Sequence, residues 1–255
     1  MKHTIFCLCA LLFITIKINA QQFINKGSIE FEVITNVKKT MGNSSWDEML
    51  KDQMPTFKTA YYNFTFADNK SLYKFDHYDE KKARVPENLR RGEDENEWYN
   101  DFTAGQAINQ KSIFGTLLNL KDSIGTITWK ISNESRMIAG FNCRKAVGKI
   151  LDSVYVFAFY TDEITISGGP CSINGLPGMI MGVTIPRLYV SMMATKLNVA
   201  EVKENIIKPS LSKKYYTSRE INTIINKRIK DWFANQEMDD DSKSWINQMI
   251  WVTLL

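Results

Sequence analysis

Short segments in which apolar and polar residues alternate recur along most of the chain, and they constrain its fold more than any other feature. The first is Gly27–Val33, where Ile29, Phe31 and Val33 alternate with polar neighbours. A period of two residues is typical of a β-strand with one buried face. Because several such segments follow one another with short turns between them, the sequence predicts a mainly β protein.

The expected architecture is a curved antiparallel sheet or half-barrel with a short N-terminal helix and a C-terminal helix. A hairpin is predicted where turn residues Asp68–Lys70 separate two strand-like segments. Val154–Thr161 is apolar on both faces, which predicts a central strand covered on both sides. The expected strands after the first are 59–66, 71–75, 98–102, 110–119, 126–131, 141–151, 154–161, 178–185 and 189–202.

Three segments depart from the strand pattern. Ser45 and Glu48 have the spacing of a capping box, so a short helix is expected before Pro55. Residues 76–97 are densely charged and are predicted to form a solvated loop. Residues 217–255 form a helical tail, with apolar side chains at helical spacing between 217 and 236 and an apolar end whose role the sequence leaves open. The apolar stripe consists of Ile221, Ile224, Ile225, Ile229, Trp232 and Phe233.

Residues 1–20 have the order of an export signal. A basic residue, Lys2, precedes an apolar run that ends at Ile16, and the small residue Ala20 stands at the expected cleavage position. The run is shorter than the roughly 20 apolar residues that a membrane-spanning helix needs. We therefore expect a cleaved signal peptide at 1–20 and a single β-rich domain at 21–255, in the periplasm or associated with the outer membrane.

Composition narrows the class of protein further. Hydrophobic residues make up 44% of the chain and aromatic residues 12%, which is typical of a packed globular core. The 32 basic and 28 acidic residues are interspersed, whereas proteins that bind nucleic acid concentrate basic charge on one surface. Lys2 and Lys17 leave with the signal, so the net charge falls from +4 to +2. We expect no nucleic-acid partner.

Few residues capable of catalysis or metal binding remain after cleavage. These are one histidine, His77, and two cysteines, Cys143 and Cys171. Two alternatives are open for the cysteines: they form a disulfide, or they are two buried thiols. The three have no short spacing typical of structural zinc. Methionines at strand spacing are more often core residues than copper ligands, so no metal and no cofactor is expected; they are Met179, Met181, Met192 and Met193.

The segment Gly175-Leu176-Pro177-Gly178-Met179-Ile180 differs by one residue from the hexapeptide that names the GLPGLI family of exported Bacteroidetes proteins (Porphyromonas-type). The surroundings also resemble that family, from Trp129 through the run Ile138–Ala146 to the aromatic strand 155–161. Ala158, Cys171 and Met179 depart from its usual residues. The resemblance implies a β-rich exported protein of uncharacterised activity, found beside outer-membrane or TonB-dependent transport components.

The signature hexapeptide also has a physical meaning of its own. Gly175 and Gly178 can adopt positive φ on either side of Pro177, whose φ is fixed, so the segment predicts a tight turn before an apolar strand. This turn is either a structural corner or the lip of a ligand site. The sequence does not decide between the two.

No catalytic residue is predicted, because the familiar hydrolase, zinc-protease and nucleotide-binding motifs are absent from the sequence. We expect a non-enzymatic envelope protein that binds a hydrophobic ligand such as a lipid, a peptide, or an outer-membrane transporter or other envelope protein. One alternative is a secreted hydrolase with a carboxylate pair that the sequence does not reveal. A protein that handles metal through thiols and methionines is a weaker alternative.

Overall fold

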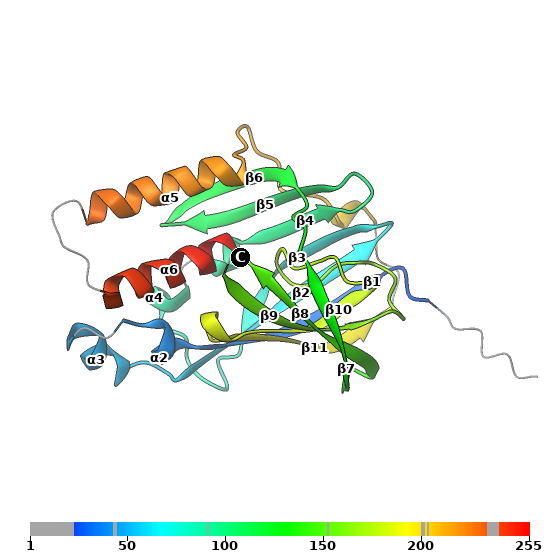
Figure 1. Ribbon diagram of the computed structural model, residues 1–255, viewed down its shortest axis with the longest axis horizontal. Coiled ribbons are helices and arrows are strands. Elements are labelled where there is room, and N and C mark those ends of the chain that lie inside the picture. The colour runs from blue at the N-terminus through cyan, green and yellow to red at the C-terminus, as the bar shows by residue number, and fades with distance from the viewer. Residues whose placement is uncertain are drawn as a thin grey trace, which may run out of the picture.

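The structure is a computed structural model that describes residues 23–42, 45–90, 92–151, 153–199, 202, 204–233 and 240–255. The signal peptide predicted at 1–20 lies outside these residues. Within them, eleven strands form one antiparallel sheet in the order β6-β5-β4-β3-β2-β1-β11-β10-β9-β8-β7 (Figure 1). The prediction of a mainly β protein built on an antiparallel sheet is confirmed. The strands are β1 Gly27–Asn36, β2 Phe57–Ala67, β3 Lys70–Tyr78, β4 Glu97–Asp101, β5 Gln106–Ile113, β6 Thr116–Ser123, β7 Trp129–Ile138, β8 Phe141–Ile150, β9 Val154–Thr161, β10 Met179–Ile185 and β11 Val190–Asn198.

Two long C-terminal helices pack on the sheet: α5 lies on β5 and β6, and the end of α6 lies against the main core. The predicted N-terminal helix is α3, and the predicted C-terminal helix is α5, followed by α6. None of the helices in the described part of the chain has the length and apolar character that a membrane crossing requires. The helices are α2 Val37–Thr40, α3 Ser45–Lys51, α4 Glu87–Arg90, α5 Ser218–Trp232 and α6 Asp240–Leu254, with short 3-10 turns η1 Glu93–Glu95, η2 Pro186–Leu188 and η3 Glu204–Ile206.

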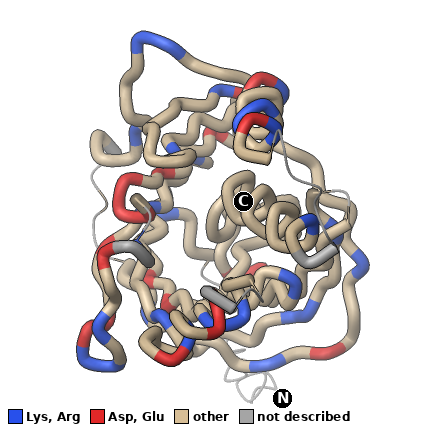
Figure 2. Tube along the Cα trace, turned by 90° about the vertical axis from the view of Figure 1, so that its left-hand side faces the viewer, with Lys and Arg blue, Asp and Glu red and all other residues tan. Residues whose placement is uncertain are grey.

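The sheet curls so that its inner face surrounds the main core, and Figure 2 shows the chain as a ring with the C-terminus inside it. Strand residues alternate between the two faces, as in β9, where Val154, Val156 and Ala158 are fully buried. The inner face is rich in aromatic rings: Tyr62 and Tyr73 stack with centroids 5.0 Å apart. The loop 162–178 and the end of α6 complete this core.

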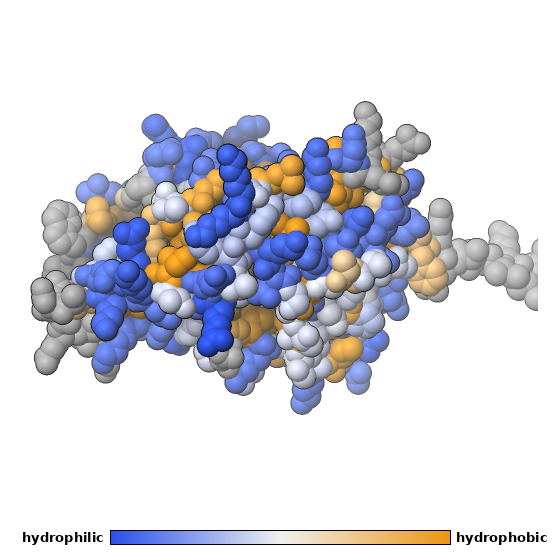
Figure 3. Space-filling model, turned by 90° about the horizontal axis from the view of Figure 1, so that it is seen from above, coloured by the Kyte–Doolittle hydropathy of each residue, from blue (hydrophilic) through white to orange (hydrophobic). Residues whose placement is uncertain are grey.

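Helix α5 packs on the β5–β6 end of the sheet through one narrow apolar stripe. Ile221, Ile225 and Ile229 are buried against Ile113 of β5 and Leu120 of β6. Ile224 and Trp232, which the sequence placed in the same stripe, are instead 36% and 48% exposed. In Figure 3, which views the molecule from the α5 side, apolar residues gather between charged ones.

Several predicted segments differ from the structure. The expected strand 126–131 is observed as β7, Trp129–Ile138. The expected strand 110–119 is divided by a tight hairpin turn at Phe114–Gly115, where both residues have positive φ, into β5 and β6. The charged segment 76–97 is partly folded rather than an open loop: β3 extends to Tyr78, α4 and η1 follow, and Val85 is 1% exposed. Glu93 explains part of this order, because it accepts a hydrogen bond of 2.5 Å from the buried Lys58.

Candidate functional site

The signature hexapeptide lies in the loop that fills the inside of the curled sheet. Loop side chains alternate between the core and the surface: Ile164, Ile173 and Leu176 are almost fully buried, whereas Gly175 and Pro177 are exposed. The loop is fixed to β7 by the indole of Trp129, whose Nε1 donates to the carbonyl of Asn174 at 2.9 Å. The signature is therefore an internal part of the core packing.

The turn itself is built on one close backbone approach. The amide of Gly178 donates to the carbonyl of Leu176 at 2.8 Å, around Pro177. Gly178 has a φ of 125°, and a Cβ at this position would lie 2.1 Å from the carbonyl oxygen of Thr161. Only glycine fits there. This geometry makes the signature a structural corner that directs the chain into β10.

A shallow hollow of about 460 Å³ lies beside the exposed side of this corner. A second hollow of about 470 Å³ lies between the turn at 104–106 and residues 215–217. Both are open to solvent, so neither encloses a ligand. The lining of the first consists of Asp162, Thr165, Ser167, Gly175, Leu176, Pro177 and Gly178.

Of the two alternatives for Cys143 and Cys171, the structure shows two buried free thiols. Cys143 lies on β8, and burial raises its pKa to about 11. Cys171 lies in the interior loop, where burial raises its pKa to about 12. Because the thiolate is the reactive form, both side chains have the character of inert core residues.

The structure does not group the sulfur and imidazole side chains into a metal centre. His77 is exposed on the outer face of β3, where Asp76 lies 2.7 Å from its Nδ1, whereas Cys171 is buried in the main core. Within the described residues, no three His, Cys, Asp or Glu side chains are placed to share an ion. Met179, Met181 and Met192 are buried in the main core, as the core interpretation predicts.

Register brings a continuous row of side chains together on the outer face of the sheet, which the sequence did not reveal. Residues directly opposite one another on antiparallel neighbours point to the same side. This relation links one residue on each strand from β8 to β3. The row is Lys145, Phe159, Gly182, Met193, Glu32, Tyr61 and His77.

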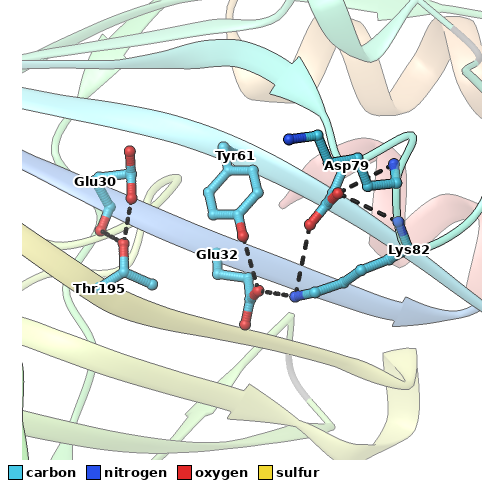
Figure 4. Close-up of polar contacts among 7 residues, drawn as sticks. Glu30, Glu32, Tyr61, Asp79, Lys82 and Thr195 are labelled. Carbon is cyan, nitrogen blue, oxygen red and sulfur yellow. Dashed lines mark hydrogen bonds and ion pairs between the residues drawn. The ribbon is translucent and has the colours of Figure 1, made fainter.

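The β1–β3 end of this row is a hydrogen-bonded carboxylate network (Figure 4). Oε1 of Glu32 accepts from the Tyr61 hydroxyl at 3.0 Å and from the ammonium of Lys82. Lys82 also lies 3.7 Å from Asp79. Desolvation, and then the hydrogen bond to Glu32, raise the pKa of Tyr61. His77 stacks on the same Tyr61 ring with centroids 4.7 Å apart.

The β9 end of the row corrects one sequence-based expectation. Val154–Thr161 is a strand at the predicted position, but its inner face is fully covered and its outer face only in part. On the outer face Tyr155 is 59% exposed and Phe157 and Phe159 are half-buried. Arg136 partly covers the Phe159 ring, with the guanidinium carbon 4.0 Å from the centroid, and its Nη2 lies 2.7 Å from the sulfur of Met193.

A buried cation inside the sheet is the second feature that the sequence did not indicate. Lys111 of β5 is 3% exposed, and its Nζ donates to the carbonyl of Leu254 at 2.8 Å. Trp98 donates from Nε1 to the carbonyl of Leu255 at 3.2 Å. Burial lowers the pKa of Lys111 to about 8. The two side chains thus satisfy carbonyls at the C-terminal end of α6, which a helix leaves without internal partners.

Comparison with known proteins supports the fold alone. No protein-family model matches the chain, and no curated protein does. Two solved structures of PNGF-II are similar, one in space group P21 at TM-score 0.51 and 13% identity, and one in C2 at 0.50 and 12%. They cover 80% and 79% of this chain, but the chain spans only about a third of PNGF-II, 34% and 33%.

Proposed function

We propose that the protein is an exported component of the cell envelope, periplasmic or associated with the outer membrane, that works by binding rather than by catalysis. Its partner is a lipid, a peptide or an outer-membrane protein such as a TonB-dependent transport component. The proposal joins the signal-like segment 1–20 and the resemblance to the GLPGLI family with one structural observation. That observation is the outer face of β9, where Tyr155 is 59% exposed and Phe157 and Phe159 are half-buried beneath the side chains of Lys145 and Arg136.

The exposed outer face favours surface recognition over chemistry in a cleft. Aromatic side chains contribute much of the energy at protein interfaces, and a row of them on a rigid sheet needs no rearrangement to bind. The hydrolase alternative requires a carboxylic acid whose pKa is raised. Two surface carboxyl groups, Asp122 and Glu220, have pKa values shifted in the opposite direction, because backbone amides that donate to them lower the pKa.

The test is affinity purification of the tagged mature chain from envelope fractions, followed by mass spectrometry of proteins and lipids. We expect the same partner to be recovered with the wild type and with Trp232→Ala, which removes an exposed aromatic ring on α5. Tyr155→Ala, which removes an equally accessible ring on β9, should reduce recovery about tenfold.

Two results would contradict the proposal. One is recovery of nothing beyond the tag control. The other is equal recovery with both variants, which would place the contact on a different surface. Export is tested separately by the N-terminal sequence of the protein in the periplasmic fraction, which should begin at Gln21.

A further inference from the structure

The outer face of β7–β9 places cations between its aromatic rings. On this face Lys145 lies opposite Phe159, and Lys149 lies opposite Tyr155. Between these two pairs, Lys130 of β7 lies opposite Val147 of β8, and Val147 lies opposite Phe157 of β9. The ammonium of Lys145 also lies 5.7 Å from the Phe157 ring. Basic and aromatic side chains therefore alternate over three strands.

We name this surface the cationic-aromatic patch. Among the described residues of these three strands, four cations share this face with the acid Glu134, whose carboxylate is 2.8 Å from Lys145. The described side chains of the patch are therefore mainly basic, in a mature chain whose expected net charge is only +2. The members are Lys130, Arg136, Lys145, Lys149, Tyr155, Phe157 and Phe159.

From this arrangement we infer that the cationic-aromatic patch docks the protein on a bilayer that contains anionic phospholipid. The inference rests on the proposed function and names its partner. Basic residues are attracted to anionic headgroups, and aromatic rings favour the interfacial region of a bilayer.

The rest of the outer face supports a membrane surface over a small molecule or an acidic protein. Both shallow hollows described above lie outside the patch, so the patch offers a broad face rather than an enclosure. On the same side of the sheet, Glu30 and Glu32 of β1 carry the opposite charge. These two acids are balanced by cations, since Glu30 lies opposite Lys196 and Glu32 pairs with Lys82. The unbalanced positive charge lies at the β7 end, so the protein would approach a bilayer with its β7 edge foremost.

The experiment is co-sedimentation of the mature protein with vesicles. Vesicles of phosphatidylethanolamine and phosphatidylglycerol are compared with vesicles of phosphatidylcholine, at low and high salt. We expect binding only to the anionic vesicles, and weaker binding as salt screens the cations. The double variant Lys130→Gln/Lys149→Gln should lower the affinity about tenfold.

The matched control is Lys227→Gln/Lys230→Gln, which removes the same charge from two exposed positions on α5. It should bind within about twofold of the wild type. Tyr155→Ser keeps every charge and should lower the affinity for anionic vesicles about threefold at both salt concentrations. The four proteins should have the same thermal unfolding midpoint, because all these side chains lie on the surface.

The inference is overturned if the wild type binds neither vesicle, if it binds both equally, or if the two double variants are weakened alike. A second pair of results separates the two proposals. If the protein does not bind vesicles, but purification recovers an acidic envelope protein with the wild type and not with Tyr155→Ala, the lipid partner is wrong and the proposed function is supported. If purification also recovers nothing, both fail together.

Discussion

Among single residues, Gly178 has the least freedom to change. Its φ of 125° is rare for residues with a side chain, and an added Cβ would meet backbone atoms of Thr161 and Asp162. Gly178→Ala must therefore strain the turn or push β9 and β10 apart. We expect a loss of about 3 kcal/mol or more in the free energy of unfolding, measured by urea denaturation.

Gly105→Ala is the control for positive φ without a steric clash. Gly105 has a φ of 65°, and nothing lies within 4 Å of the position that an added methyl group would occupy. Its substitution should cost about 1 kcal/mol. Equal losses for the two variants would show that backbone conformation alone, rather than the approach to Thr161, makes glycine necessary in the signature.

The two thiols allow a second test at this scale. Burial holds the pKa values of Cys143 and Cys171 at about 11 and about 12, so at pH 8 both remain protonated in the folded state. We expect both to react with a thiol reagent at least about a hundredfold more slowly in the native protein than after unfolding. A mass that rises by two hydrogens on reduction would instead reveal a disulfide.

At the scale of elements, the start of α5 depends on a reciprocal cap. The amide of Glu220 donates to Oγ1 of Thr217 at 3.2 Å, and the amide of Thr217 donates to the Glu220 carboxylate at 2.7 Å. Thr217→Ala should lower the free energy of unfolding by about 1 kcal/mol. Thr223→Ala, inside the same helix, should change it by less than half of that, and the reverse order would contradict the cap.

The sequence predicted elements well where one periodicity dominated. The limits of β9 match the prediction because apolar residues fill both of its faces between turn residues. The turn between β5 and β6 was missed because Phe114 lies within an apolar run, and a left-handed conformation is uncommon for phenylalanine. Its partner Gly115 was the one local signal that could have marked it.

The candidate site was less predictable, for a physical reason. Periodicity shows that Tyr155, Phe157 and Phe159 share a face, but the presence of a covering layer depends on where distant segments pack. The loop 162–178 and α6 both contribute to the core on the inner face, whereas on the outer face only side chains such as Arg136 and Lys145 partly cover the rings. The row from Lys145 to His77 requires the register of seven strands, and β-bulges shift that register at positions the sequence does not mark.

For the whole molecule, Lys111 links the sheet to the helix that occupies its opening. Its pKa falls from 10.5 when exposed to about 8 in the folded protein. Between these values the unfolded state binds more protons, so the contribution of Lys111 to the free energy of unfolding rises with pH. From pH 7.5 to 9.5 the wild type should gain about 1–2 kcal/mol relative to Lys111→Met, measured by urea denaturation at each pH.

An exposed lysine provides the control for this pH dependence. Lys74 of β3 points into solvent. The difference between the wild type and Lys74→Met should therefore stay constant within about 0.5 kcal/mol over the same interval. If the Lys111→Met difference is equally flat, the ammonium is not buried against the end of α6.

The strand order has a consequence for the time course of folding. Strands β1–β6 pair in sequence, and so do β7–β11, so each half can form from hairpins between chain neighbours. Among the eleven strands of the described residues, the pairing of β1 with β11, such as Phe31 opposite Ala194, is the one that joins the two halves of the sheet. This pairing requires nearly all of the chain to have been synthesised. During synthesis the edge of β1 therefore stays unpaired until β11 is available.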